Sequence, residues 1–145
     1  MTTAESEALY TAIRRTLLNR AAGAPDAGAI AEATLGIWRQ LAARLAPVIG
    51  ARGVDAIFVR SLYLTTSSFP WLAVAGEQGD SAALLASLKV RFAGRETDVA
   101  MEAAYTLLAT FTELLTTLIG EYLTERLLGS VWAPPPQESQ PENAP

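Results

Sequence analysis

The sequence predicts an all-α protein, an up-down bundle of about five helices arranged around a long helix near the C-terminus. Apolar residues recur at helical spacing from about Thr97 to about Trp132, the longest periodic stretch in the chain. Glycine and proline divide the remaining sequence into segments of helical length, and no segment shows the alternation of a credible strand. We also find no internal repeat in the sequence.

The long helix carries two neighbouring apolar rows, and two rows make a stripe wide enough to be covered on more than one side. The rows are Ala104, Leu108, Phe111, Leu115, Leu118 and Tyr122, and Leu107, Leu114, Ile119, Leu123 and Leu127. Gly120, preceded by Thr116 and Thr117, is a weak point in the helix. The helix either bends near Gly120, which leaves a separate C-terminal arm, or continues as one rod.

Four shorter helices are expected before it. Asp26 is a good N-cap for the second, and Pro47 ends that helix or kinks its last turn. A short connection at 50–53 follows, and Gly94 is a natural C-cap for the fourth helix. Thr97 or Asp98 then starts the long helix. The expected ranges of the four are 4–22, 27–46, 54–66 and 82–93.

The composition changes abruptly after Trp132. Residues 133–145 contain five prolines and no large apolar side chain. Such a segment cannot bury enough apolar surface to compensate for the entropy of ordering. We therefore expect a single helical-bundle domain over 1–132 and a disordered Pro-rich tail over 133–145.

Composition argues against most catalytic chemistry. The chain has no cysteine and no histidine, which removes thiol catalysis, the usual general base and the commonest ligands of transition metals. No Gly-x-Ser-x-Gly element is present. We expect a protein that is not an enzyme, with no catalytic residues, no metal site and no cofactor.

Charge and hydropathy narrow the range of partners. The net charge is −4 and no basic face is evident, so we do not expect nucleic-acid binding. The long apolar helix contains Glu113 and five threonines between 103 and 120, which favours a buried helix of a soluble protein over a membrane span. The N-terminus lacks the basic and apolar regions of a signal peptide, so we expect a cytoplasmic location.

One non-helical stretch is a candidate binding element. Phe69 and Trp71 flank Pro70, which forces the preceding residue toward an extended conformation. The two aromatic side chains either anchor a partner or close the end of the bundle as a lid. Arg60 and Tyr63, just before them, are the candidate polar groups of a binding site. Arg60 is also a candidate partner of Glu113 if another subunit covers that carboxylate.

The apolar content indicates a covered surface. Half of the residues are hydrophobic and 18% are charged, so a partner or a second copy is expected to cover part of the chain. The second row of the long helix and the arm beyond Gly120 are the leading candidates. The predicted interface residues are Leu114, Leu118, Tyr122, Leu123, Leu127 and Trp132.

Two functions fit these observations. The first is an adaptor or regulatory module that self-associates and docks a partner protein through an apolar groove or its C-terminal helix. The second is a sensor bundle that holds a small apolar ligand in an internal pocket, lined by 54–66, the Phe-Pro-Trp segment and the long helix. The lack of converging charged groups favours the first.

Overall fold

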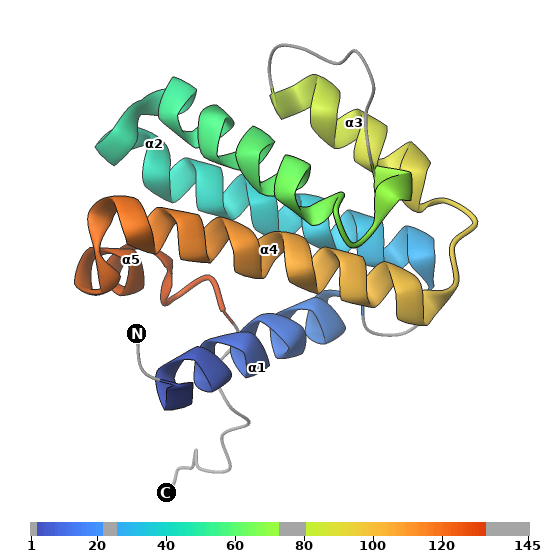
Figure 1. The fold of residues 1–145 in the computed structure, drawn as a ribbon, viewed down its shortest axis with the longest axis horizontal. Coiled ribbons are helices and arrows are strands. Elements are labelled where there is room, and N and C mark those ends of the chain that lie inside the picture. The colour runs from blue at the N-terminus through green and yellow to red at the C-terminus, as the bar shows by residue number, and fades with distance from the viewer. Residues whose placement is uncertain (1–2, 22–25, 73–80, 133–145) are drawn as a thin grey trace, which may run out of the picture.

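A computed structural model describes residues 3–21, 26–72 and 81–132, and it confirms an all-α bundle of five helices (Figure 1). The described residues contain no strand. The predicted disordered tail lies outside them. The helices are α1 (Thr3–Arg20), α2 (Ala27–Thr65), α3 (Ser81–Phe92), α4 (Thr97–Ile119) and α5 (Glu121–Leu128), with a short 3-10 turn, η1, at Pro70–Leu72.

Helix α2 differs from the two helices expected there. The Asp26 carboxylate caps it as predicted, accepting a hydrogen bond of 2.8 Å from the Ala29 amide. Pro47 does not end the helix. The break comes at Gly50, with φ 84° and ψ 153°, and helical structure resumes at the next residue. The expected connection at 50–53 is thus a single residue between a first limb, 27–49, and a second limb, 51–65.

The C-terminal helix is two helices and not one rod. Gly120 separates α4 from α5 with φ 91° and ψ 160°, so the weak point that the sequence indicates is a true break. The Gly120 amide donates to the Thr116 carbonyl over 2.8 Å and closes the last turn of α4. Helix α4 begins at Thr97 as expected, and Glu96 occupies the N-cap position without a side-chain cap bond.

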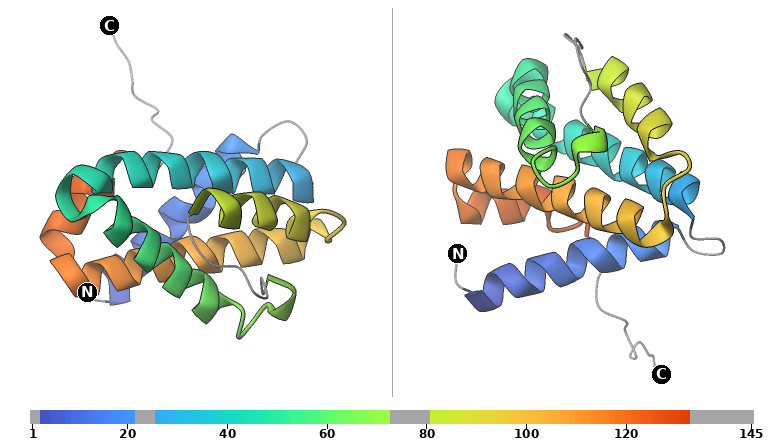
Figure 2. Two further views of the ribbon diagram at one scale, coloured as in Figure 1. Left: turned by 90° about the horizontal axis from the view of Figure 1, so that it is seen from above. Right: turned by 45° about the vertical axis from the view of Figure 1, so that its right-hand side comes forward.

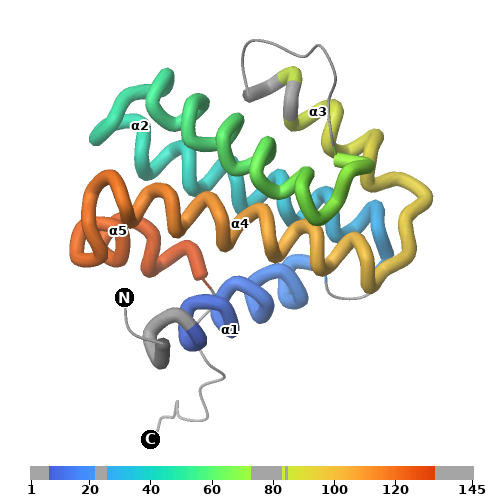
Figure 3. Tube along the Cα trace, viewed as in Figure 1, coloured from blue at the N-terminus to red at the C-terminus, as the bar shows by residue number. Residues whose placement is uncertain are grey.

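The two breaks reveal a repeated plan. Thr97 follows Ala27 by 70 positions, and Gly120 follows Gly50 by 70 positions. In each half a helix (α1 or α3) precedes a long helix that breaks at a positive-φ glycine and turns back. The first limb of α2 and helix α4 run in the same direction, so that both breaks lie at one end of the molecule (Figures 1 and 2). Figure 3 shows the same course along the Cα trace.

Positions 70 residues apart agree more often in burial than in residue type. Leu45 and Leu115 are buried at matching positions, and Val48 and Leu118 are exposed at matching positions. Most other matched positions hold different residue types, such as Trp38 and Leu108. The two halves therefore share their apolar pattern and the position of their break, but few identical residues. This explains why no repeat is evident in the sequence.

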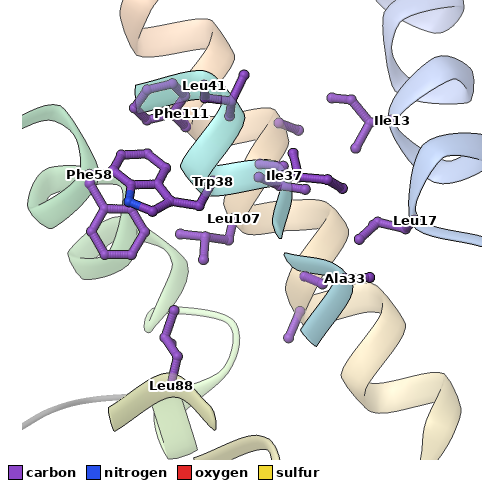
Figure 4. Packing of buried hydrophobic residues seen from close by; sticks show 14 of the residues in the cluster. Ile13, Leu17, Ala33, Ile37, Trp38, Leu41, Phe58, Leu88, Leu107 and Phe111 are labelled. Atoms are coloured by element: carbon purple, nitrogen blue, oxygen red, sulfur yellow. The ribbon is translucent and has the colours of Figure 1, made fainter. Parts of the chain in front are cut away.

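The core lies mainly between α2 and α4. The Trp38 ring on the first limb packs against Phe58 of the second limb at a tilt of 41°, with ring centroids 4.2 Å apart, and meets Phe111 of α4 edge-on at 5.0 Å. Ile13 and Leu17 enter this core from α1, as Figure 4 shows. Each half thus contributes to one shared core: α1 packs on α4 of the other half, and α3 packs on α2.

Hydroxyl groups within this core bond back to their own helices. Thr34, Ser61 and Thr112 are buried, and each donates to the carbonyl four residues earlier at 2.7–2.9 Å. Such bonds satisfy a buried hydroxyl without a partner helix. None of the helices among the described residues has the length and apolarity that crossing a membrane would need.

Candidate interaction surface

Large apolar side chains reach the surface at seven described positions, and three of them gather at the two glycine breaks. Val48 precedes Gly50, whereas Leu118 and Tyr122 lie on either side of Gly120. The other four are Leu18, Val59, Tyr63 and Val90. Leu118 is 67% exposed and Tyr122 is 73% exposed, so both present most of their surface to solvent.

Charged residues flank these apolar positions, with opposite signs at the two breaks. The break in α2 has exposed Arg44 and Arg52 beside it. The break between α4 and α5 has exposed Glu121 and Glu125 beside it, together with one exposed arginine, Arg126. We call this surface the break end. It consists of Arg44, Val48, Arg52, Leu118, Glu121, Tyr122 and Glu125.

Tyr122 is held by a neighbour on its own helix. Arg126, one turn later, donates a hydrogen bond of 3.1 Å to the Tyr122 hydroxyl, and its guanidinium carbon lies 5.7 Å from the ring centroid. These contacts restrict the rotamers of Tyr122. A restricted aromatic side chain loses less entropy on binding, which suits a contact residue.

The predicted interface residues lie in three different environments. Leu118 and Tyr122, members of the first apolar row, are exposed. Leu114 and Leu127 are half-buried against the core of the same chain, and Leu123 is half-buried. Trp132 is buried, at 8% exposure, so it is not available on the surface of this chain. The second apolar row is thus not a free face, because Leu107 is buried and its other members are half-buried.

Arg60 and Tyr63 lie on the outer face of the second limb of α2. Both are exposed, Tyr63 at 68%, and Val59 is exposed one turn before Tyr63. Two side chains that point to solvent do not line a closed cavity within this chain. The structure therefore does not bring Arg60 and Tyr63 together with the core as a ligand pocket would require.

Phe69 and Trp71 pack at the opposite end of the bundle. Trp71 meets Phe69 edge-on with ring centroids 6.2 Å apart, and meets Phe92 of α3 edge-on at 5.4 Å. The Arg95 guanidinium lies 4.5 Å from the Trp71 ring centroid. Both aromatic residues are half-buried. These contacts tie both rings to their own chain, and whether they also anchor a partner stays a prediction.

No family model, curated protein or solved structure matches this chain. Its function must therefore be argued from its own residues. Among the described residues, no group of three or more acidic side chains could hold a metal ion.

A polar contact between α1 and α4 was not anticipated from the sequence. The Tyr10 hydroxyl donates to the carboxylate of Glu113, which is exposed in this chain. A pairing of Glu113 with Arg60 was expected only where another subunit covers Glu113, and it stays a prediction. Arg14, one turn along α1, donates to Glu102 over 2.9 Å, and its guanidinium carbon lies 4.0 Å from the Tyr105 ring centroid. The i, i+4 spacing of Tyr10 and Arg14 is the only sequence signal for this contact.

The pKa shifts in this contact favour the ordinary protonation state of each shifted group. The hydrogen bond to Glu113, with burial and the nearby negative charge, raises the pKa of Tyr10 to about 12. The hydrogen bond from Arg14 to Glu102 raises the pKa of Arg14, and burial raises the pKa of Tyr105. All of these shifts keep the groups in their ordinary protonation states near neutral pH. Tyr10, Arg14 and Tyr105 are therefore not poised for proton transfer near neutral pH.

Proposed function

We propose that the protein is a cytoplasmic, non-catalytic interaction module, an adaptor or regulator, that docks a partner protein through the end of α4 and the start of α5. One observation carries the proposal. Leu118, two residues before the Gly120 break, is 67% exposed, and Tyr122, two residues after it, is 73% exposed. A pair of large apolar side chains on packed helices offers a preformed contact site.

The surroundings of this pair resemble the layout of a protein interface. Charged side chains, Glu121 and Glu125, lie beside the apolar pair in the manner of a polar rim. Tyrosine is enriched among the residues that dominate binding energy, because it combines a large apolar ring with a hydroxyl at low entropic cost. We therefore expect Tyr122 to contribute more to binding than Leu118.

The alternative function, a small-ligand sensor, has less support. It places Arg60 and Tyr63 as polar groups inside a pocket, whereas both side chains are exposed on α2. The aromatic pair Phe69 and Trp71 is engaged with Phe92 and Arg95 at the end of the bundle. No contact among the described residues favours a ligand there over a lid.

The test is site-specific photocrosslinking in the native host. A benzophenone amino acid replaces Tyr122 in one variant and Tyr63 in a matched control, because Tyr63 is a tyrosine of similar exposure on a different helix. We expect strong crosslinking to a protein from position 122 and much weaker crosslinking from position 63. Equal or absent crosslinking from the two positions would contradict the proposal.

A further inference from the structure

We infer that the partner at the break end is a second copy of this chain. The two copies dock end to end about a two-fold axis, so that the basic break of one faces the acidic break of the other. This inference rests on the proposed function, because it uses the same Leu118 and Tyr122 surface and specifies its occupant.

Shape is the first argument. The breaks at Gly50 and Gly120 have nearly the same backbone conformation, with φ 84° and 91° and ψ 153° and 160°. Each is preceded, two residues earlier, by an exposed apolar residue, Val48 or Leu118. Both breaks lie at the same end of the bundle (Figures 1 and 2). That end therefore presents two similar breaks side by side. A two-fold axis can place the two breaks of one copy against the two breaks of a second copy.

Charge selects one of the two possible pairings. Two copies facing each other can place each break against its own counterpart or against the other break. The first arrangement would bring Arg52 toward Arg52 and Glu125 toward Glu125. The second brings arginines toward glutamates at two symmetry-related places, and opposite charges across an interface fix its register. The chain thus carries both halves of a complementary surface.

The neighbouring charges do not reverse this pattern. Asp55 lies one turn after Arg52 and is half-buried, and Arg126 is bonded to the Tyr122 hydroxyl. The α2 break carries one net positive charge, the sum over Arg44, Arg52 and Asp55. The α5 break carries one net negative charge, the sum over Glu121, Glu125 and Arg126. The contrast in sign between the breaks therefore remains.

The apolar residues supply the centre of the interface. Val48, Leu118 and Tyr122 are 47%, 67% and 73% exposed in one copy, so that a second copy has apolar surface to cover at each break. Burial of this surface favours association, and the charge pairs around it are screened by salt. We therefore expect a reversible dimer in which the affinity of one copy for the other falls as ionic strength rises.

The experiment is sedimentation of the purified full-length chain over a range of concentrations. Wild type should form a dimer, while Arg52→Glu and Glu125→Arg should each weaken dimerisation at least tenfold. The double variant Arg52→Glu/Glu125→Arg should recover most of the affinity, because the swap restores opposite charges. Arg39→Glu is the control, since Arg39 is exposed on the first limb well before the break. It should dimerise like wild type.

Any of three results would overturn the inference. One is a wild-type chain that stays monomeric at every concentration. A second is a dimer whose affinity is unchanged by both single charge reversals, and a third is a dimer that the double variant fails to restore. Circular dichroism of each variant shows whether the helices are intact. If the chain is monomeric but position 122 crosslinks to a different protein, the inference fails while the proposed function stands.

Discussion

At the scale of single residues, two glycines decide the course of the chain. Gly50 and Gly120 have φ near +90° with extended ψ, a region that side chains with a Cβ rarely adopt. A Cβ built at either position meets no atom within 4 Å. The requirement for glycine is therefore one of backbone conformation and not of space.

Alanine at either break should destabilise the fold. We expect Gly50→Ala and Gly120→Ala to lower the free energy of unfolding by about 1–3 kcal/mol, the cost of holding a side chain in a sparsely populated backbone region. Urea denaturation followed by circular dichroism measures the change. Gly53→Ala is the matched control, because Gly53 is helical and a Cβ there would make ordinary contacts of 3.4 Å with Ile49. Alanine at position 53 should be neutral or stabilising, and an equal loss at positions 50 and 53 would contradict this explanation.

Thr124 is a second residue with a measurable role. It is buried at 5% exposure, and its hydroxyl has no hydrogen-bond partner among the described residues. In the other half the matching position is Val54, which is buried at 2% exposure and has nearly the same shape. An unsatisfied buried hydroxyl opposes folding, because it has lost its hydrogen bonds to water.

Replacing Thr124 with valine should stabilise the protein. We expect the free energy of unfolding of Thr124→Val to rise by about 1 kcal/mol, since the isosteric change removes an unpaired hydroxyl. Thermal denaturation with a two-state fit provides the measurement. Thr34→Val is the control, because the Thr34 hydroxyl donates to the Ile30 carbonyl and its loss should give no gain. If Thr124→Val destabilises as much as Thr34→Val, the hydroxyl at 124 has a partner in solution.

At the scale of elements, the position of α1 depends on a contact with α4 that combines apolar and polar residues. Ile13 and Leu17 bury its apolar side, and the Tyr10–Glu113 and Arg14–Glu102 pairs lie at the edge of the same contact. Exposed polar pairs add little to stability, whereas buried apolar residues add more. The apolar side therefore holds α1 in place, and the polar pairs fix its register along α4.

The Tyr10 pair gives α1 a dependence on alkaline pH. The pKa of Tyr10 is raised from 10.0 to about 12 in the folded protein, so the folded state holds this proton more tightly than the unfolded chain. Its stabilising contribution is complete below pH 10 and is lost as the pH rises from about 10 to about 12. We expect the difference in free energy of unfolding between wild type and Tyr10→Phe to shrink across that range.

Urea denaturation of both proteins at several pH values between 8 and 12 tests this expectation. Tyr105, whose pKa is also raised, is present in both proteins, so the difference between them isolates Tyr10. Tyrosinate absorbance near 295 nm gives an independent reading, because one tyrosine should ionise later in wild type than in the variant. A constant difference in stability over the whole range would show that the Tyr10–Glu113 bond does not form in solution.

At the scale of the whole molecule, the two halves are interlocked and not independent. Helix α1 packs on α4, and α3 packs on α2, so each long helix is covered by the first helix of the other half. The Trp38 ring likewise contacts Phe58 of its own half and Phe111 of the other. Neither half has an apolar core that its own residues close.

Separated halves should therefore fold only together. We expect a fragment covering 1–76 and a fragment covering 77–145 each to lack a cooperative thermal transition when alone. Mixed in equal amounts, they should recover helical content and a cooperative transition, because the shared core can then form. Circular dichroism of the fragments, singly and mixed, provides the measurement. A cooperative transition in either fragment alone would show that half to be an independent folding unit.

Helical periodicity in the sequence determined the fold class and most of the core. Regularly spaced apolar residues such as Leu41, Leu45, Leu108 and Leu115 could be assigned to the core because a helix places every third or fourth residue on one face. Asp26 could be assigned as a cap, and Gly120 as a weak point, for reasons equally local to the chain. What periodicity cannot give is the direction in which a helix turns after a break.

Tertiary structure alone decided which apolar surface stays exposed. Leu118 and Leu123 look alike in the sequence, yet Leu118 is exposed and Leu123 is half-buried, on either side of the break at Gly120. The pairing of Glu113 with Tyr10 also depends on how α1 lies across α4, a contact between residues 103 positions apart. The sequence by itself determined the helices and their apolar faces, whereas the packing of the two halves determined the surface left for a partner.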